Sequence, residues 1–166
     1  NTQALIDASA LFEGASAANP DVSSWDTSKV ETLARIFKDA SVAVPDTSAW
    51  DTATVTTLER SFEGAALADP DVSTWDTSKV TTLGYTFART TLADPDVSAW
   101  DISSVETLQG TFYQAANANP DVAGWDTYGI ANMRSTFQQA TRALPALSGW
   151  DFSEATELSG FLAGID

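Results

Sequence analysis

The sequence predicts an α/β fold: a curved solenoid of parallel tandem repeats with one short strand and one helix in each 25-residue unit. All six Trp and all six Pro recur at intervals of 25 residues. An Asp follows every Trp, and the apolar residues after each Trp-Asp pair are spaced like one face of a helix. We therefore expect residues 1–166 to form a single solenoid domain of six full 25-residue repeats plus a partial N-terminal repeat.

Two aromatic rows are the most regular feature of the sequence. The first row consists of Trp25, Trp50, Trp75, Trp100, Trp125 and Trp150. The second row consists of Phe37, Phe62, Phe87, Phe112 and Phe137, preceded by Phe12. Burial of one Trp removes roughly 150–250 Å² from water. We interpret both rows as a structural ladder of buried rings that stack from one repeat to the next, and not as a platform for a ligand.

The helix is predicted over residues 29–40 of one unit and over the equivalent residues of the others. Ser28 and Glu31 have the spacing of a capping box, with Ser28 as the N-cap. The apolar stripe of this helix is Val30, Leu33, Phe37 and Ala40, at i, i+3, i+7 and i+10. The proline that follows cannot continue the helix.

The strand is predicted to cover about three to five residues around each Trp. Val22, Trp25 and Thr27 have the spacing of inward-facing positions, and the residues on either side of Trp25 are polar. Neighbouring strands lie about 4.8 Å apart, whereas packed helices lie about 8–10 Å apart. The stack should therefore curve, with the strands on its concave face.

The composition limits the classes of partner and cofactor. The net charge of −15 repels nucleic acid and anionic lipid, so neither is expected as a partner. No apolar run approaches the ~20 residues of a membrane span, so no span is expected within this segment. The absence of Cys and His removes the usual zinc ligands; no cofactor is expected, and any bound metal would be a hard cation such as Ca²⁺. Because the chain begins at Asn1 without Met, we expect a mature product or an excised piece.

The acidic rows are the main candidate sites. The row after Trp consists of Asp26, Asp51, Asp76, Asp101, Asp126 and Asp151. These carboxylates would either accept hydrogen bonds at the turn into the helix or hold Ca²⁺ between adjacent units. The row after Pro consists of Asp21, Asp46, Asp71, Asp96 and Asp121, where turn chemistry and cation binding are again the two interpretations.

Two further sets of side chains have candidate binding roles. The row Thr32, Thr57, Thr82 and Thr107 resembles the arrays that bind ice, but its place on the predicted helix favours a solvated surface. Three tyrosines interrupt their columns: Tyr85, Tyr113 and Tyr128. Exposed aromatic rings can stack on sugars.

The repeat unit resembles the 25–26-residue repeats of bacterial surface proteins and lipoproteins known from mycoplasmas, Listeria, lactobacilli and marine bacteria. The segments from Phe12 to Val30 and from Phe62 to Leu83 show the pattern best. The resemblance implies a form similar to leucine-rich-repeat solenoids, a place on the cell surface, no catalytic residues, and roles in adhesion and partner binding. Met133 keeps a Met that this family often has, where the other repeats have Leu.

These observations favour a non-enzymatic, adhesin-like module, extracellular or on the cell surface, that binds an unknown surface protein or glycan. The alternative is a structural stalk, filament or surface-array subunit that self-associates end to end. A distant alternative is a carboxylate-based polysaccharide enzyme. Catalytic sites need non-equivalent groups, whereas the carboxylates here are mostly repeated and no His is present. We therefore expect no catalytic residues.

Overall fold

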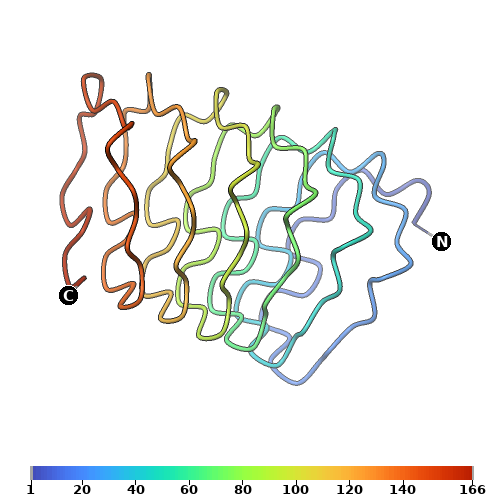
Figure 1. The fold of residues 1–166 in the computed structure, drawn as a ribbon. Coiled ribbons are helices and arrows are strands. Elements are labelled where there is room, and N and C mark those ends of the chain that lie inside the picture. The colour runs from blue at the N-terminus through green and yellow to red at the C-terminus, as the bar shows by residue number, and fades with distance from the viewer. Residues whose placement is uncertain (1, 166) are drawn as a thin grey trace.

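The computed structural model describes residues 2–165, which form a stack of coils (Figure 1). The β pairing in this part of the chain consists of isolated parallel bridges that join, in succession, Asp7, Thr32, Thr57, Thr82, Thr107, Asn132 and Glu157. Each bridge joins a residue to its equivalent one period later, so each 25-residue period forms one coil. We number the coils 1 to 6 from these bridges: 7–31, 32–56, 57–81, 82–106, 107–131 and 132–156. Residues 157–165 begin a seventh coil.

The prediction of an α/β, leucine-rich-repeat-like solenoid is wrong in both of its elements. None of the residues 2–165 is helical, and the range 29–40 contains turns and the bridge residue Thr32. The residues around Trp25 form no strand. Ser28 does not cap a helix; its hydroxyl donates to Asp26 Oδ1 at 2.6 Å.

Tandem four-residue turns replace the predicted helix. The amide of Ile36 donates to the Leu33 carbonyl at 3.2 Å, and Ala40 donates to Phe37 at 3.0 Å. The third residue of each turn has a positive φ of 58°, as type II turns require; these residues are Arg35 and Asp39. Such turns bury Leu33, Ile36, Phe37 and Ala40, which stand at i, i+3, i+4 and i+7. One face of an α-helix has this same spacing, so the apolar pattern could not distinguish the two structures.

The amides that the turns leave free donate to the next coil. Leu33 donates to the Thr57 carbonyl at 3.3 Å, and Phe37 donates to Ser61 at 2.9 Å. Arg35 and Asp39 donate in the same way, and equivalent bonds join every coil to the next. Local and inter-coil bonds thus alternate along the chain and satisfy its polar groups without a helix or a continuous strand. We call residues 32–39 and their equivalents the paired face.

On the opposite side, a threonine hydroxyl lies between neighbouring coils. This side, residues 45–54 and their equivalents, is named the Asp face. Thr27 Oγ1 donates to the Asp51 carbonyl at 2.9 Å and accepts from the Asp51 amide at 2.8 Å. Ring centroids of stacked Trp neighbours are 6.0–6.4 Å apart, against 5.3–5.7 Å between neighbouring Phe rings of the paired side.

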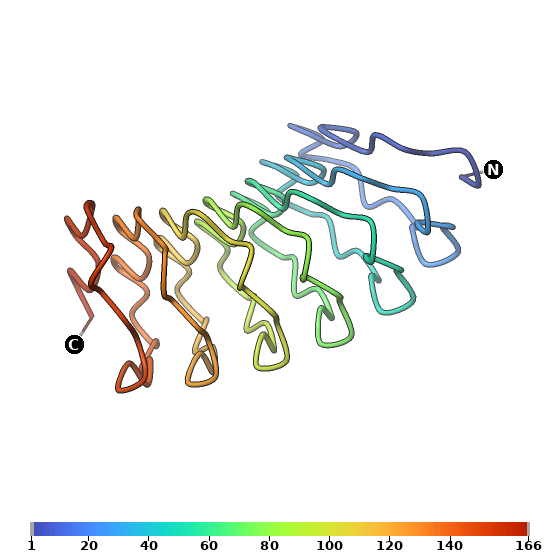
Figure 2. The same cartoon turned by 90° about the horizontal axis from the view of Figure 1, so that it is seen from above.

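These spacings explain the shape of the stack. Figure 2 shows that the coils fan out, with close spacing along one side and wider spacing along the other. Direct backbone bonds hold the paired face at the close spacing, whereas the interposed Thr hydroxyls accompany the wider spacing of the Asp face. The paired face is therefore concave. The expectation that segments around Trp would line the concave side is wrong.

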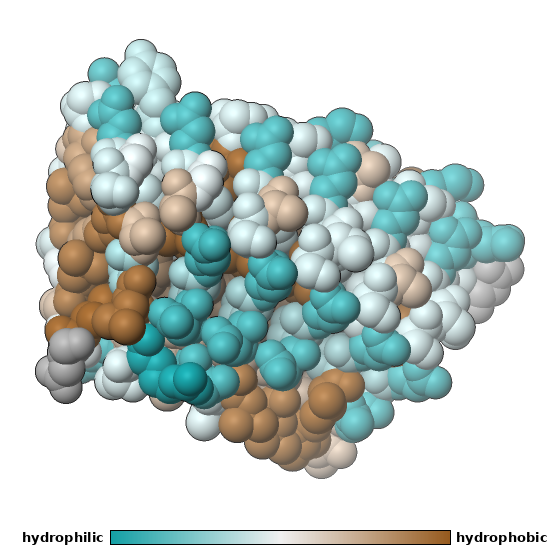
Figure 3. Space-filling model, in the orientation of Figure 1, coloured by the Kyte–Doolittle hydropathy of each residue, from teal (hydrophilic) through white to brown (hydrophobic). Residues whose placement is uncertain are grey.

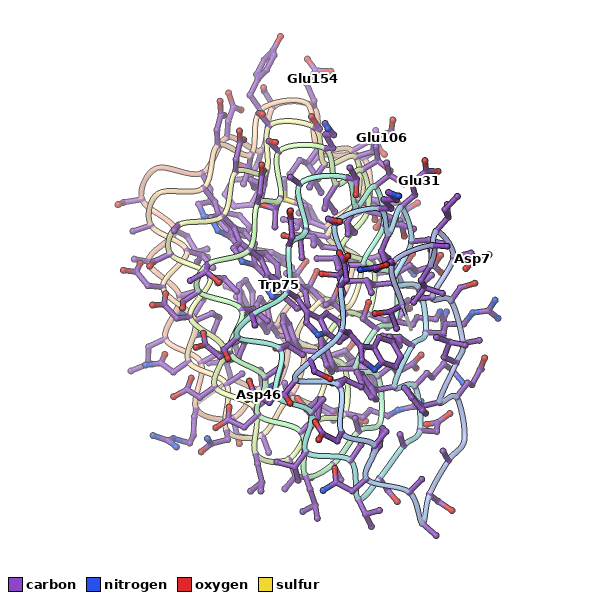
Figure 4. The ribbon with its side chains drawn as sticks, turned by 90° about the vertical axis from the view of Figure 1, so that its right-hand side faces the viewer. Asp7, Glu31, Asp46, Trp75, Glu106 and Glu154 are labelled. Atoms are coloured by element: carbon purple, nitrogen blue, oxygen red, sulfur yellow. The ribbon has the colours of Figure 1, made fainter. Side chains whose placement is uncertain are left out.

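The core lies between the two faces. Phe62 packs against Trp75 across the interior with 6.3 Å between ring centroids, and Figure 4 shows Trp75 inside the coil with Asp46 and Glu31 at its periphery. Trp100 Nε1 donates to the Val72 carbonyl at 3.1 Å. Among the described residues, no buried side-chain nitrogen or oxygen lacks a hydrogen-bond partner. The core is therefore apolar at its centre, and its polar atoms are satisfied.

Candidate binding face

The side chains of the paired face vary on a backbone that repeats. The position of Arg35 is occupied in the other coils by Ala10, Arg60, Tyr85, Gly110, Ser135 and Gly160. The position of Lys38 is occupied by Glu13, Glu63, Ala88, Tyr113, Gln138 and Ala163. On the Asp face, in contrast, Pro, Trp and the Asp after Trp recur in every full repeat. Repeat proteins commonly bind partners on their concave surface, so variation there marks a candidate binding site.

Paired charges occupy the N-terminal half of the paired face. The Glu63 side chain is 6% exposed and contacts Arg60 Nη1 at 2.9 Å and Arg89 Nη2 at 2.8 Å. Arg89 also approaches Asp39 at 3.7 Å, and Lys38 pairs with Asp39 at 2.7 Å. The guanidinium and carboxylate groups of this half thus neutralise one another across coils 2 to 4.

A network of neutral side chains continues from these ion pairs toward the C-terminus. The Arg60 guanidinium lies over the Tyr85 ring at 4.6 Å from its centroid. Gly110 lies against the same ring, where a Cβ atom would overlap it. Gln109 Nε2 donates to Tyr85 Oη at 3.0 Å, and Asn132 Nδ2 donates to Gln109 Oε1 at 3.3 Å. Tyr85 and Gln109 are thus held in place before any ligand arrives.

Beside this network is a polar depression of about 400 Å³. Its lining residues are Tyr85, Gln109, Tyr113, Arg134, Ser135 and Gln138. None of the ion pairs among residues 2–165 includes the exposed Arg134. The paired-face segments of these coils contain no Asp or Glu, although the chain has a net charge of −15; they are 82–89, 107–114 and 132–139. We name this the Tyr-Gln depression.

The predicted aromatic ladder lies in the interior. Trp50 and Trp75 stack with 6.0 Å between centroids and an interplanar angle of 7°, and Phe62 and Phe87 stack at 5.7 Å and 2°. The five Phe rings from Phe37 to Phe137 are fully buried, whereas Trp25 in coil 1 is only partly buried.

The Asp residues after Trp form local turns. Asp76 Oδ1 accepts from the Ser78 amide at 3.0 Å and from its hydroxyl at 2.7 Å. The amide bond recurs at Asp26, Asp51, Asp101, Asp126 and Asp151. The bond from the serine hydroxyl is the main cause that lowers the pKa of Asp76 below its usual value, and the serine amide contributes next. The carboxylates thus accept hydrogen bonds at turns, but these turns lead into no helix.

The Asp residues after Pro have the same geometry. Asp46 Oδ1 accepts from the Ser48 amide at 3.1 Å and from its hydroxyl at 2.6 Å, and the hydroxyl bond is the main cause that lowers the pKa of Asp46. The Asp face turned toward the viewer in Figure 3 accordingly shows rows of hydrophilic side chains. Among residues 2–165, no group of three or more acidic side chains is placed to hold a metal ion.

These turns predict how stability depends on pH. Because the pKa of Asp76 is lowered in the folded protein, its bond to Ser78 stabilises the fold fully above the unfolded pKa, near 3.8, and this stabilisation is lost as the pH falls through the folded value. Ser78→Ala should therefore lower the Tm at neutral pH, and the difference from wild type should shrink in acid. Thermal melts across this range test the prediction, with exposed Thr74→Ala as control. A difference that is constant with pH would contradict it.

The Thr row and the three tyrosines, which were the remaining predicted candidates, lie in different parts of the structure. Thr32 lies at a bridge between coils, partly buried, and its Oγ1 accepts from the Ala34 amide at 3.2 Å. Tyr85 and Tyr113 meet in the Tyr-Gln depression, whereas Tyr128 is 69% exposed and outside it. The solvated helix surface expected for the Thr row is thus wrong, because these residues join coils.

Sequence reasoning did not single out Gln109, Arg134, Ser135 or Gln138. The sequence did contain a signal for these residues, since each stands at a position of the repeat where the residue type changes from coil to coil. It was hidden because the range was interpreted as a helix, in which variable polar residues are ordinary solvent-facing positions.

Comparisons with known proteins identify a family without a known function. The model of the family described as Mycoplasma protein of unknown function, DUF285, matches residues 1–69 and 56–166. No curated protein matches the chain, and no solved structure does. No helix among the described residues is long and apolar enough for a membrane span.

The match confirms the expected mycoplasma-type family, but its description includes no surface, lipoprotein or adhesive property, so it gives no support to those expectations. Because the two matched ranges together cover the whole chain, the protein belongs to the family of Mycoplasma proteins of unknown function, DUF285.

Proposed function

We propose that the chain is a non-enzymatic binding module whose concave paired face takes a protein or a glycan. One observation carries the proposal: the concave paired face combines a strictly repeated backbone with side chains that differ between coils. A constant scaffold with variable, preorganised side chains supports selective recognition at a low ordering cost.

The state of the carboxylates supports the non-enzymatic part. Most Asp side chains accept hydrogen bonds within their own turn, as Asp76 and Asp46 do. Glu63 is held between Arg60 and Arg89. An extracellular or cell-surface location is part of the same proposal, and a net charge of −15 suits a cation-rich medium.

An array of glycans and extracellular proteins, probed with wild type and two variants of equal Tm, tests the proposal. The paired-face variant is Tyr113→Ala with Gln138→Ala, and the Asp-face control is Ser24→Ala with Thr74→Ala, which changes two exposed residues. We expect wild type and the control to capture the same ligand and the paired-face variant to lose most of that signal. Blank arrays, or equal loss in the control, would contradict the proposal.

A second candidate function, end-to-end assembly, is favoured by the two end faces of this chain. At one end, four backbone amides donate to no residue within 2–165: those of Leu158, Gly160, Leu162 and Gly164. At the other end, four carbonyls accept from none of these residues: those of Asp7, Ser9, Leu11 and Glu13. Their equivalents join adjacent coils throughout the stack, so the two edges match in register. A second copy, or further coils of this type, would continue the ladder.

Light scattering over a wide concentration range tests this assembly. Leu158 and Leu162 are 40% and 42% exposed. Figure 3 shows hydrophobic residues, coloured brown, at this end of the molecule. The wild type is expected to grow in mass with concentration, and Leu158→Lys with Leu162→Lys is expected to prevent growth. The control for added charge is Ala49→Lys with Ala99→Lys, at two exposed positions of the Asp face. A wild type that stays monomeric throughout would rule the assembly out.

A further inference from the structure

We infer that the Tyr-Gln depression binds an acidic saccharide, with the sugar carboxylate at Arg134 and the sugar hydroxyls at Gln109 and Gln138. This inference rests on the proposed function, since it names the ligand class of the same concave face. It starts from the contrast between the two halves of that face.

The charge of the depression differs from that of the rest of the molecule. In the N-terminal half, the basic side chains Arg60 and Arg89 are neutralised by Glu63. In the C-terminal half, Arg134 is exposed, lines the depression and belongs to no ion pair within residues 2–165. The three paired-face segments 82–89, 107–114 and 132–139 carry no carboxylate, and the next segment, 157–164, carries only Glu157, at the bridge to Asn132. A ligand carboxylate would therefore meet a guanidinium group whose donors are not already committed to a carboxylate.

The other lining groups suit hydroxyls rather than further charges. Gln109 is oriented by two bonds, from its Nε2 to Tyr85 Oη and to its Oε1 from Asn132. Gln138 and Ser135 are partly buried and line the same depression. Amides and hydroxyls both donate and accept, as a row of sugar hydroxyls requires.

An aromatic ring completes the set. Tyr113 is partly exposed in the depression, and the apolar face of a sugar ring can pack on such a ring. Tyr85 is covered by Arg60 and Gly110, so its hydroxyl rather than its ring serves the site. The volume of about 400 Å³ lies in the range of small-molecule sites.

A short saccharide fits this site better than a long polyanion does. The carboxylate-free surface covers only parts of coils 4 to 6, and the surrounding chain is strongly acidic. A nucleic acid or an extended acidic peptide would place most of its charge against that acidic surface. A saccharide with one carboxylate per ring can place a single charge at Arg134 and its hydroxyls on neutral groups.

Calorimetry with three probes tests the inference on the full chain. The probes are a galacturonic acid oligomer, a neutral galactose oligomer of equal length and a glutamate peptide of equal charge. We expect the uronic acid oligomer to bind most tightly and its affinity to fall with added salt. Arg134→Gln should weaken this binding by at least about tenfold, the effect of losing one charged hydrogen bond.

Matched variants separate the site from the general charge of the face. Arg35→Gln removes the same charge from the N-terminal half of the paired face and should leave affinity unchanged. Gln138→Ala is a second variant of the depression and should also weaken the binding of the uronic acid oligomer. Melts confirm that each variant is folded.

Three outcomes overturn the inference. If the neutral oligomer binds as tightly as the uronic acid oligomer, the ligand carboxylate has no role in binding. If Arg134→Gln and Arg35→Gln lose the same affinity for the uronic acid oligomer, the depression is not the binding site. Tighter binding of the glutamate peptide would replace a saccharide with a peptide. In each case the paired face still binds a ligand, so the proposed function stands. If no probe binds and the arrays are also blank, both fail.

Discussion

Replacing Trp75 with alanine is expected to destabilise the chain by about 3–5 kcal/mol, as for large aromatic residues in other cores. Trp75 is 3% exposed and stacks on Trp50 at 6.0 Å and on Trp100 at 6.4 Å. It also contacts Phe62 across the interior, at 6.3 Å. Loss of the Trp75 side chain would leave a cavity and remove contacts to both the Trp column and the Phe column. The cavity would lie in the middle of a stack whose coils contact only their neighbours.

Thermal melts and amide hydrogen exchange measure this effect. The loss is a large share of the ~5–15 kcal/mol that stabilises a typical domain, so exchange should become fast in coils 2 to 4 first. Trp25→Ala is the matched control, because Trp25 is only partly buried and stacks on Trp50 alone within its row. A fall in Tm of less than a few degrees for Trp75→Ala, or equal loss in both variants, would contradict the buried ladder.

Gly110→Ala is expected to destabilise the protein by about 1–3 kcal/mol, the cost of a strained backbone plus a clash. Gly110 has φ +61°, and a Cβ there would overlap the Tyr85 ring. In a helix the same change would stabilise, because alanine is favoured over glycine by about 1 kcal/mol. The sign of the effect therefore distinguishes the observed turns from the predicted helix.

The reciprocal substitution at the equivalent position of coil 6 provides the control. Ser135 has φ 56°, a conformation that glycine adopts without strain. Ser135→Gly should be neutral or stabilising by up to about 1 kcal/mol, measured by denaturant unfolding of both variants. Stabilisation by Gly110→Ala together with destabilisation by Ser135→Gly would mean that these residues are helical.

Glycine was a signal in the sequence against a helix. Five glycines fall at the two positions of each period that have positive φ: Gly14, Gly64, Gly110, Gly160 and Gly164. The other residues at these positions, such as Arg35 and Tyr85, are ordinary in helices and concealed the pattern. A bulky residue with positive φ persists only where the surrounding structure enforces it, and here the inter-coil bonds do so.

The candidate site was only partly predictable for a related reason. Tyr85 and Tyr113 were recognised because aromatic residues interrupt a regular column. Gln109 and Arg134 were not, because a polar residue gains meaning only from its neighbours in adjacent coils. Those neighbours stand about one period away in the chain, as Gln109 does from Tyr85.

The sequence by itself determined the period, the membership of the two aromatic columns and the turns at Asp, because these depend on residue type and local spacing. It also determined the family, since the match covers the whole chain. Only the tertiary structure decided between a helix and tandem turns over residues 29–40, and with it which face is concave. The apolar spacing fits both structures, and what separates them is the destination of the backbone amides. In the stack, every second amide from Leu33 to Asp39 finds its carbonyl in the next coil, and this is a property of the assembly rather than of any local segment.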